Sequence, residues 1–404
     1  MKVAVIFHRL GPYHVARLAA AGRQMDLTAV ELASQTSEYA WDPVDSGASF
    51  QRFTLFPDGD SRAAGSPEVR QRLHAALAAA KPSVVVVPGW SDAGALAALE
   101  WSIRNNVPAI VMSESTAWDE PRVAWKEWTK RRLVGLCSAG LAGGTPHAEY
   151  LIQLGLPREN ISLGYDAVDN NYFAANAAAA RANPSAVRRQ HGLPENYFLA
   201  SARFIEKKNL PRLFEAYARY RQIASASHSE TLPAAPWDLV LLGDGPLRPQ
   251  IERLISDLRL PSSVHLPGFK QYPDLPAYYA CARVFIHAST SEQWGLVVNE
   301  AMACGLPVLV SNRCGCARDL AQPGVNGFTF DPLSVEQLAS FMVKISAFNF
   351  PLSAFGAASH RLIANWGPER FASGLQSAAE CALRVGPVKS TLPQRIILKA
   401  LLSR

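Results

Sequence analysis

Short apolar runs that are rich in β-branched residues alternate along this chain with longer stretches of helical pattern. In the first half the runs are KVAVIF (2–7), LTAVEL (27–32), SVVVVP (83–88), PAIVMS (108–113) and GLCSAGLAG (135–143). None of them alternates strictly between apolar and polar residues, which is typical of strands that are covered on both faces. Helical patterns such as 91–105 and 121–134 lie between them. The order predicts βαβ units and a doubly wound parallel sheet.

A second series of the same kind follows a change in composition. Residues 174–195 are rich in Ala, Asn and Arg and contain prolines, and we interpret them as the connection between two domains. The apolar runs beyond them are YFLASARF (197–204), DLVLLG (238–243), VHL (264–266), RVFIHAS (283–289), PVLVS (307–311) and GFTF (327–330). A chain of 404 residues is long enough for two cores. We therefore predict two Rossmann-like α/β halves with a cleft between them, rather than one large domain.

Composition and charge narrow the class of protein. The chain is 49% hydrophobic and 18% charged, which is typical of a globular protein and not of a disordered one. A formal net charge of +6 is a small excess for this length, and it favours an anionic ligand or surface over nucleic acid. The sequence has no basic motif with interleaved aromatic residues of the RNA-binding kind.

The cysteines and the apolar runs indicate a cytoplasmic protein. The six cysteines lack metal-like spacing, which favours reduced thiols; they are Cys137, Cys281, Cys304, Cys314, Cys316 and Cys381. His8 and Arg9 interrupt the first apolar run, so we expect a strand there and not a signal peptide. No run approaches the roughly 20 apolar residues that span a bilayer.

The segment SEQWGLVVNEAMACGLPVLVS (291–311) combines a loop, a helix and a strand. Glu292 lies in the loop at the carboxyl end of the preceding strand, and Glu300 lies in a helix expected over 296–304. In parallel sheets ligands bind at this edge, where the N-termini of helices favour anions. Two carboxylates beside an anion site indicate a ligand with hydroxyls on both sides of a diphosphate. A nucleotide sugar has this chemistry.

A diphosphate also needs cations, and the stretch SARFIEKKNL (201–210) supplies them. Arg203 ends a strand and Lys208 follows in the next loop, so both side chains can point at the same edge of the sheet. Local evidence alone also allows ordinary basic residues on the surface. In LLGDGPLRP (241–249), Gly243 makes a turn after a strand, and this turn either approaches the ligand or only shapes the loop.

The second half resembles a family 4 glycosyltransferase (glycosyl transferases group 1) of the GT-B fold. The motifs that carry the resemblance stand in the family's order: Arg-x4-Lys (203–208), GDGP (243–246), LPGF (266–269), Glu-x7-Glu (292–300) followed by AMACGLPVLVS, and GVNGFTFDP (324–332). In the first half, GYDAVDNNYF (164–173) resembles the Gly-x-Asp…Phe segment before the family's interdomain linker. The resemblance implies two Rossmann-like doubly wound domains that face each other across a cleft.

The resemblance also implies a donor site for a nucleotide-diphosphate sugar. It places Arg203 and Lys208 on the diphosphate. It places Glu292 on the sugar and Glu300 on the ribose, and Arg203, Lys208 and Glu292 are the expected catalytic residues. The other expected donor-binding positions are Gly11, Gly243, Phe269, Trp294, Gly295, Leu296 and Val297. The implied reaction is a hexosyl transfer with retention of configuration that requires no metal and no other cofactor.

The first half departs from the family in one loop. Many members carry a histidine after the fourth strand, near the transferred sugar, whereas this loop reads PGWSDAG (88–94). Trp90, Ser91 and Asp92 occupy it instead. The candidate contacts to the sugar or the acceptor are therefore His14, Trp90, Ser91 and Glu114. For His14 and Glu114, a purely structural role stays open.

The implied domain order is an acceptor-side domain at 1–173, a linker at 174–195, a donor-side domain at 196–375, and a helix at 376–404 that crosses back to the first domain. Segments 118–133 and 384–404 combine basic residues with tryptophans or an apolar face. These segments either pack on the first domain or make a peripheral contact with an anionic membrane.

The sequence therefore predicts an enzyme that transfers a sugar from a nucleotide-sugar donor to a glycan or lipid-linked acceptor. The expected setting is bacterial-type polysaccharide, glycolipid or cell-surface glycan synthesis, in the cytoplasm or at the inner face of the cell membrane. Two alternatives stay open. One is another GT-B enzyme, such as a nucleotide-sugar 2-epimerase or a phosphorylase, and the other is a non-catalytic nucleotide-sugar-binding partner of a transferase.

Overall fold

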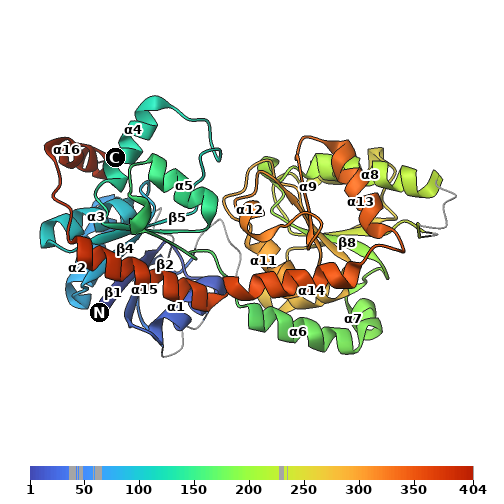
Figure 1. The fold of residues 1–404 in the computed structure, drawn as a ribbon, viewed down its shortest axis with the longest axis horizontal. Coiled ribbons are helices and arrows are strands. Elements are labelled where there is room, and N and C mark those ends of the chain that lie inside the picture. Colours follow the sequence, from blue (N-terminus) through green and yellow to red (C-terminus); the bar gives the residue numbers. More distant parts are fainter. Residues whose placement is uncertain are drawn as a thin grey trace. The chain divides into compact units, whose positions relative to one another are not determined.

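The chain forms two compact units in the computed structural model (Figure 1). The structure describes residues 1–35, 42, 44, 49–57, 59, 66–226, 232–233 and 235–403. The first unit comprises Met1–Asp169 together with Trp366–Arg404, and the second comprises Asn170–Asn365. Each unit has a parallel β-sheet between layers of helices, which confirms the predicted Rossmann-like architecture.

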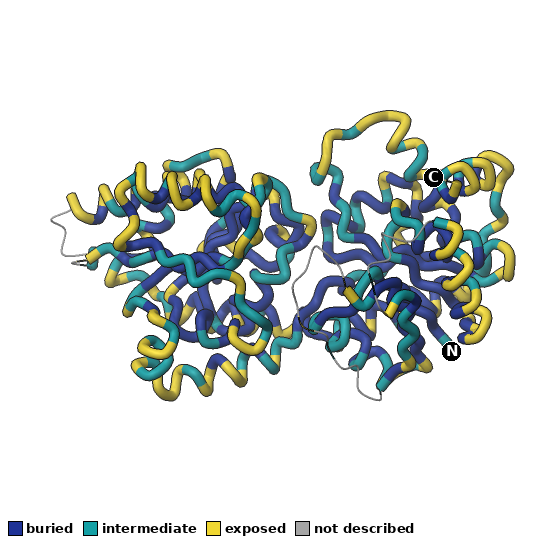
Figure 2. Tube along the Cα trace, turned by 180° about the vertical axis from the view of Figure 1, so that it is seen from behind, coloured by how far each residue is buried: buried dark blue, intermediate teal, exposed yellow. Residues whose placement is uncertain are grey.

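Within the described part of the first unit, seven parallel strands form one sheet in the order β3-β2-β1-β4-β5-β6-β7. The strands are β1 (Lys2–Phe7), β2 (Asp26–Ala33), β3 (Gln51–Phe56), β4 (Val84–Pro88), β5 (Ala109–Ser113), β6 (Ala139–Ala142) and β7 (Ile161–Leu163). Most residues of β1 and β4 are buried, which explains why their sequences do not alternate (Figure 2). The apolar runs do not indicate β3 or β7, because β3 mixes polar and partly exposed residues and β7 has three residues.

Helices cover both faces of the first sheet. Two helices far apart in the sequence, α1 (Pro12–Gly22) and α15 (Pro368–Val385), pack against one another on one face. The opposite face is covered by α2 (Ser66–Ala80), α3 (Ala93–Asn105), α4 (Ala124–Val134), α5 (Thr145–Gln153) and α16 (Leu392–Leu402). The C-terminal part of the first unit starts at Trp366 and forms the two helices α15 and α16. The structure thus differs from the expected single helix at 376–404.

Within the described part of the second unit, six parallel strands form a sheet in the order β10-β9-β8-β11-β12-β13. The strands are β8 (Tyr197–Ser201), β9 (Asp238–Leu242), β10 (Val264–Gly268), β11 (Val284–His287), β12 (Val308–Ser311) and β13 (Gly327–Phe330). Each of them lies within or next to one of the apolar runs, so the sequence prediction of this sheet is confirmed.

The helices of the second unit form two groups. The first group packs with the sheet in one hydrophobic core and comprises α8 (Leu210–Ala226), α9 (Arg248–Asp257) and α13 (Val335–Ser346). The second group is linked by mutual contacts and comprises α6 (Asn170–Ala182), α7 (Pro184–His191), α10 (Leu275–Cys281), α11 (Leu296–Ala303), α12 (Ala317–Leu320) and α14 (Leu352–Ile363). Short 3₁₀ turns lie at Glu206–Lys208 and Tyr272–Asp274 in this unit, at Arg158–Asn160 in the first unit, and at Ala364–Trp366 where the chain returns to the first unit.

The segment 174–195, which the sequence analysis interprets as the connection between two domains, does not lie between the two units. It lies largely in α6 and α7, and both helices belong to the second unit. Phe173 is buried against the rings of Tyr272 and Tyr279, and the Arg181 guanidinium donates to the carbonyls of Ala280 and Cys304. An alanine-rich composition favours helix, and these contacts fix α6 to the rest of the unit. The division between the units therefore falls after Asp169 instead.

Across the described part of the chain, no helix is both long enough and apolar enough to cross a membrane.

Candidate functional site

The loops at the carboxyl ends of β8, β9 and β11 carry most of the residues that the sequence predicts for a donor site. Arg203 follows β8, Gly243 follows β9, and Glu292 lies in the loop after β11. Because β8 lies between β9 and β11 in the sheet, the ends of these strands are neighbours along one edge. Ligands of open parallel sheets bind at this edge.

Asn209 fastens the loop that carries Lys208 to the loop after β11. Its side-chain amide donates to the carbonyl of Ala288 at 3.1 Å and to that of Pro332 at 2.7 Å. The backbone N–H of Thr290 donates to the carbonyl of Lys207 at 2.9 Å. Asn209 has a φ of 56°, a left-handed conformation that asparagine tolerates better than most residues. The sequence analysis did not identify this residue, because no local pattern indicates that the asparagine after Lys207 and Lys208 is buried.

The Glu292 carboxylate is the centre of a small polar cluster. Its Oε2 atom forms an ion pair with the Lys208 ammonium. The same oxygen lies 3.1 Å from His287 Nε2 and 3.2 Å from Ser289 Oγ. The side chains of Lys208 and Glu292 are 13% and 12% exposed, so the pair is largely shielded but still reachable from solvent. The structure thus brings together two of the three predicted catalytic residues.

The cluster keeps Glu292 ionised and His287 neutral. Burial alone would raise the pKa of the Glu292 carboxyl, but the hydrogen bond from His287 and the charge of Lys208 outweigh it and hold the pKa well below its usual range. Burial lowers the pKa of His287, and the hydrogen bond and charge of Glu292 offset this only in part. An ionised carboxylate only accepts hydrogen bonds, so Nε2 of the neutral imidazole carries the donated hydrogen.

Gly295 brings the start of α11 against this cluster. Its φ of 104° lies in the left-handed region, and a Cβ there would be 3.5 Å from both the Glu292 Cγ and the His287 Nε2 atoms. Gly295 is the N-cap of α11, and no side chain caps this end. The first N–H groups of a helix, here those of Leu296 and Val297, have no partner within the helix. The helix end beside Lys208 is therefore suited to an anion.

Glu300 and Trp294 lie in the interior of the second unit. The Glu300 side chain is fully buried, and its Oε2 accepts a hydrogen bond of 2.6 Å from the Tyr279 hydroxyl. The Trp294 Nε1 atom donates to Asn299 Oδ1 at 2.9 Å. The two glutamates of the Glu-x7-Glu motif therefore have different surroundings, since Glu292 is at the sheet edge and Glu300 is inside.

The remaining predicted donor positions of the second unit lie along the same edge of its sheet. Gly243 has a φ of 119°, and a Cβ there would lie 1.9 Å from the carbonyl oxygen of Ala202, so only glycine fits. Its N–H donates to the carbonyl of Gly268 at the end of β10, which joins two loops of this edge. Arg203 is exposed, and Phe269 is 41% exposed directly after β10.

In the first unit, Gly11 and His14 lie together at the start of α1. The Gly11 N–H donates to His14 Nδ1 at 3.1 Å, and the imidazole packs edge-on against Phe7 with ring centroids 4.7 Å apart. Burial, with the charges of Arg17 and Arg9, lowers the pKa of His14 well below its usual value. A neutral ring whose Nδ1 accepts a hydrogen bond carries its hydrogen on Nε2.

The residues that the sequence analysis singled out in the loop after β4 have different surroundings. Trp90 is buried in the hydrophobic core and packs edge-on against Tyr150. Asp92 is the N-cap of α3 and accepts from the Ala95 N–H at 2.9 Å, while burial raises the pKa of its carboxyl. Ser91 is exposed between them. Asp92 therefore has a structural role, and Ser91 is the accessible residue of this loop.

Glu114 belongs to a buried group that the sequence analysis did not identify. It follows β5 and interacts with Tyr165 and Asp166. Burial, together with the charge of Glu114, raises the pKa of the Asp166 carboxyl well above its usual value. Arg17 Nη1 lies 3.9 Å from Asp166 Oδ1 and donates to the Tyr165 carbonyl. The sequence signals for this group are its place near strand ends and the GYDAVDNNYF motif, which contains Tyr165 and Asp166.

Among the residues that the structure describes, no three His, Cys, Asp or Glu side chains come together as a metal site requires.

Two family models match the chain. The model of the glycosyl transferases group 1 matches residues 185–346, and the model of the glycosyl transferase 4-like domain matches residues 13–165. Each match falls on one of the two parallel sheets, with the first on the unit that carries the Lys208–Glu292 pair. The chain therefore belongs to the glycosyl transferases group 1 and has the GT-B fold.

Solved structures of this fold cover nearly the whole chain. Anabaena Alr3699/HepE in complex with UDP and glucose has a TM-score of 0.68 at 19% identity and covers 93% of this chain and 98% of that one. WaaG, a glycosyltransferase involved in lipopolysaccharide biosynthesis, has a TM-score of 0.64 at 16% identity and covers 94% and 98%. At these identities the similarity establishes the fold alone.

Curated relatives match over shorter regions. Alpha-monoglucosyldiacylglycerol synthase of Acholeplasma laidlawii is 28% identical over 163 residues, which are 40% of this chain and 37% of that protein. Sulfoquinovosyl transferase SQD2 of Arabidopsis thaliana is 39% identical over 101 residues, which are 24% and 19%. The chain thus spans less than half the length of these relatives.

Proposed function

We propose that the protein is an enzyme that transfers a sugar from a nucleotide-diphosphate sugar to a hydroxyl acceptor, with retention of configuration and without a bound metal. The observation that carries this proposal is the Lys208–Glu292 ion pair beside the uncapped start of α11. A cation and free helical N–H groups suit a diphosphate, and an ionised carboxylate next to them suits the hydroxyls of a sugar.

Lys208 supplies charge where the reaction needs it. As the bond between the sugar and the diphosphate breaks, negative charge grows on the leaving phosphate. A cation that is already in place stabilises this charge without reorganisation. In the free protein Glu292 holds Lys208 at the sheet edge, and the loop is fixed by Asn209. Arg203 and the start of α11 supply further positive potential, which offers a substitute for a metal ion.

Glu292 is assigned to the sugar. It is ionised, it is held in one orientation by His287 and Ser289, and a carboxylate there can accept hydrogen bonds from sugar hydroxyls. The assignment of Glu300 to the ribose stays a prediction from the family motif. It requires that the Tyr279 hydroxyl gives up its bond to Glu300 or moves with it when the nucleotide binds.

The acceptor is assigned to the first unit. Glu114 and the Nε2–H of a neutral His14 lie near strand ends of that unit and have the hydrogen-bonding capacity that hydroxyls need. For retention we propose that the acceptor hydroxyl attacks from the face of the leaving group. A phosphate oxygen of the leaving diphosphate then takes the proton, so the reaction needs no dedicated protein base.

Glycolipid, polysaccharide or cell-surface glycan synthesis is the proposed setting. The relatives named above include a synthase of a glucosyldiacylglycerol and an enzyme involved in lipopolysaccharide biosynthesis. We extend this setting to a peripheral contact of the first unit with anionic lipid at the inner face of the cell membrane. The contact would use the α4–α16 surface, which we define by the exposed side chains of Val123, Trp125, Trp128, Leu392 and Ile396.

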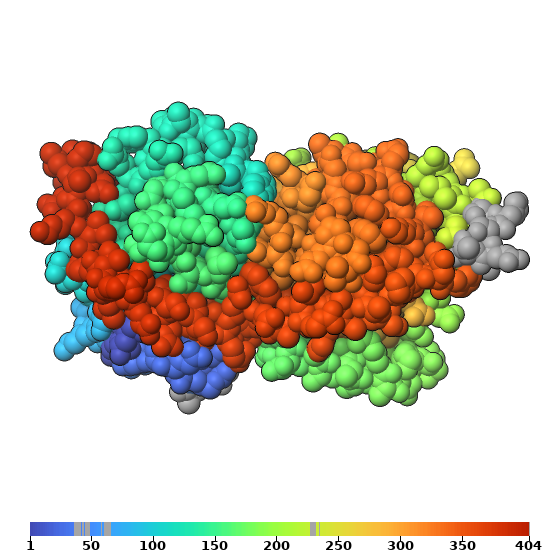
Figure 3. Space-filling view, viewed as in Figure 1, coloured from blue at the N-terminus to red at the C-terminus, as the bar shows by residue number. Residues whose placement is uncertain are grey.

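The α4–α16 surface combines apolar and basic side chains on two helices that touch. The Gln394 side chain donates to the Arg132 carbonyl at 3.1 Å, which joins α16 to α4. Lys126 and Arg132 lie over the rings of Trp125 and Trp128. In Figure 3 the end of the chain lies beside the α4 region on the surface of the first unit. Tryptophan with basic neighbours is typical of helices that lie on anionic bilayers.

A panel of nucleotide-diphosphate sugars, each with and without a chelator, tests the reaction. We expect released nucleoside diphosphate with free or transferred sugar, unaffected by the chelator, and NMR of the product should show the anomeric configuration of the donor. Conversion of one nucleotide sugar into another would instead indicate an epimerase. Binding without any turnover would indicate a non-catalytic partner.

Co-sedimentation with vesicles tests the membrane contact. Binding should require anionic lipid and should fall when Trp125 and Trp128 are replaced by alanine. Phe348→Ala, at a residue that is 70% exposed in the second unit, is the matched control. Equal loss in the control, or equal binding to neutral vesicles, would contradict the proposed surface.

A further inference from the structure

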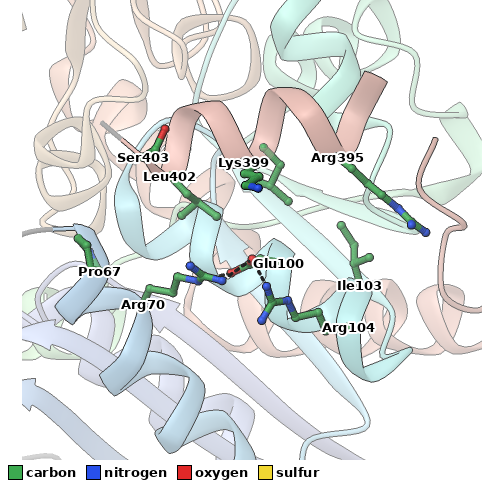
Figure 4. Close-up of a pocket in the computed structure, with 10 residues that line it drawn as sticks. Pro67, Arg70, Glu100, Ile103, Arg104, Arg395, Lys399, Leu402 and Ser403 are labelled. Carbon is green, nitrogen blue, oxygen red and sulfur yellow. Dashed lines mark hydrogen bonds and ion pairs between the residues drawn. The ribbon is translucent and has the colours of Figure 1, made fainter. Parts of the chain in front are cut away.

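A cavity of about 640 Å³ opens in the first unit between α2, α3 and α16 (Figure 4). It lies apart from the strand ends that carry the predicted acceptor residues, and neither the family motifs nor the proposed reaction uses it. Residues from all three helices line it; those used below are Arg70, Glu100, Arg104, Arg395, Leu398 and Lys399.

Four cations and one carboxylate face this cavity. Glu100 holds two of the cations, with Arg70 Nε 2.5 Å and Arg104 Nη2 2.8 Å from its carboxylate oxygens. Arg395 donates to the hydroxyl of Ser390 at 2.8 Å, and among the residues that the structure describes it forms no ion pair. Lys399 extends from α16 and has no ion-pair partner in the described part of the chain (Figure 4). The cavity therefore has an excess of positive charge.

The other walls of the cavity are apolar. Leu398 and Leu402 of α16 are buried members of the hydrophobic core, and Ile103 of α3 packs against the same core. Leu392 and Ile396, on the outward side of α16, belong to the α4–α16 surface. One short helix thus places cations between an apolar cavity wall and an exposed apolar strip. A simple inorganic anion would contact only the cations, whereas an amphiphilic anion would contact both the cations and the apolar walls.

We propose that this cavity binds the phosphate-bearing headgroup of one anionic membrane lipid. Lys399 and Arg395 would contact the phosphate, and Arg104 would approach it while bound to Glu100. The first carbons of the lipid would lie on Leu398 and Leu402. The inference rests on the proposed membrane contact. In that contact the α4–α16 surface would touch the bilayer, and the cavity would give specificity for lipids with a negatively charged headgroup.

The alternative is a solvated charged surface, in which Glu100 orders its two arginines and the lysine is simply free in water. Such a surface attracts anionic vesicles in a diffuse manner but does not bind one soluble lipid with defined stoichiometry. Stoichiometric binding in the absence of a bilayer therefore separates the two interpretations.

Native mass spectrometry and calorimetry with dihexanoyl phosphatidic acid, kept below its micelle concentration, test the proposal on the full chain. We expect one bound lipid per chain and no saturable binding of dihexanoyl phosphatidylcholine. Replacing both Arg395 and Lys399 with glutamine should weaken binding at least tenfold, since two charge-assisted contacts are lost. Replacing only Lys399 with arginine should retain binding, because the charge is kept.

Arg219 and Arg253, replaced together with glutamine, form the matched control, because both are exposed on helices of the second unit, whereas the cavity is in the first. Three outcomes would overturn the proposal: equal binding of both lipids, no effect of the Arg395 and Lys399 change, or an equal effect of the control. Inorganic phosphate that binds as tightly as the lipid would also overturn it, since the site would then serve a free anion. Nucleotide release from a sugar donor is measured separately, without lipid. A failure of the transferase proposal can therefore be distinguished from a failure of the lipid-binding proposal.

Discussion

Replacing Lys208 with alanine should weaken diphosphate binding by more free energy than the loss of one contact to the phosphate accounts for. The reason is that the negative charge of Glu292 then has no cation beside it and repels the ligand. A charge-assisted hydrogen bond to a phosphate contributes about 1.5–3 kcal/mol. An ionised carboxylate about 5 Å from a unit negative charge also repels it by about 3 kcal/mol at an effective dielectric constant of about 20. Solvent at the partly exposed edge screens some of this repulsion. The expected loss is therefore about 3–5 kcal/mol, or roughly a hundredfold to several thousandfold in affinity.

Calorimetry with the nucleoside diphosphate that the unaltered protein binds best tests this reasoning. The variants are Lys208→Ala, Glu292→Gln and the two changes combined. Glu292→Gln alone should leave affinity unchanged or increase it, since it releases Lys208 from its ion pair. The combined variant should bind at least tenfold more tightly than Lys208→Ala, because the repulsion is gone. Lys207→Ala, at the adjacent partly buried lysine, is the control and should change affinity by less than about fivefold.

Two results would refute the reasoning about this pair. One is unchanged affinity in Lys208→Ala, which would remove the lysine from the diphosphate site. The other is a combined variant that binds no better than Lys208→Ala, which would mean that Glu292 exerts no repulsion on the ligand.

Three further predictions concern the second unit. Glu300→Gln should weaken the binding of donor and nucleoside diphosphate alike, whereas Glu292→Gln should lower turnover without weakening nucleoside diphosphate binding. Steady-state kinetics and calorimetry measure both effects, and a large turnover defect in Glu300→Gln alone would contradict this assignment. The pKa of Glu292 is lowered on folding, so its stabilisation is present above the unfolded pKa of about 4.3 and is lost as the pH falls towards the folded value. The difference in unfolding free energy between the unaltered protein and Glu292→Gln, measured in urea, should therefore shrink between pH 7 and pH 3, and a constant difference would contradict the ion-pair account. Gly243→Ala should cost several kcal/mol in urea unfolding because its Cβ overlaps the Ala202 carbonyl, whereas Gly192→Ala, with a φ of 64° and open space, should cost only about 1 kcal/mol, and equal costs would contradict the close approach.

The fold could be predicted from the sequence because buried parallel strands have a distinctive composition. The runs at 238–243 and 327–330 match β9 and β13 almost to the residue. Periodicity alone could not predict that the segment at 174–195 is helical and belongs to the second unit, because its change in composition and its prolines indicate a connection between domains. Its helices depend on contacts such as those of Phe173 and Arg181, which are far apart in the sequence from their partners.

The candidate site could be predicted in part, for a related reason. Glu292 and Lys208 are separated by 84 positions, yet both follow strands that are neighbours in the sheet, so strand order alone brings them together. The roles of His287 and Ser289 could not be predicted, because a histidine at the end of an apolar run has the appearance of a core residue. The burial of Glu300 depends on packing around α11, which no local pattern encodes.

Hydrogen exchange with and without nucleoside diphosphate tests most directly whether the strand ends of the second unit hold the donor. Protection on binding should appear in the loops after β8, β9 and β11, at residues 202–209, 243–247 and 288–298, and it should disappear in Lys208→Ala at the same ligand concentration. Protection confined to the first unit, or protection of these loops that Lys208→Ala leaves intact, would contradict the account.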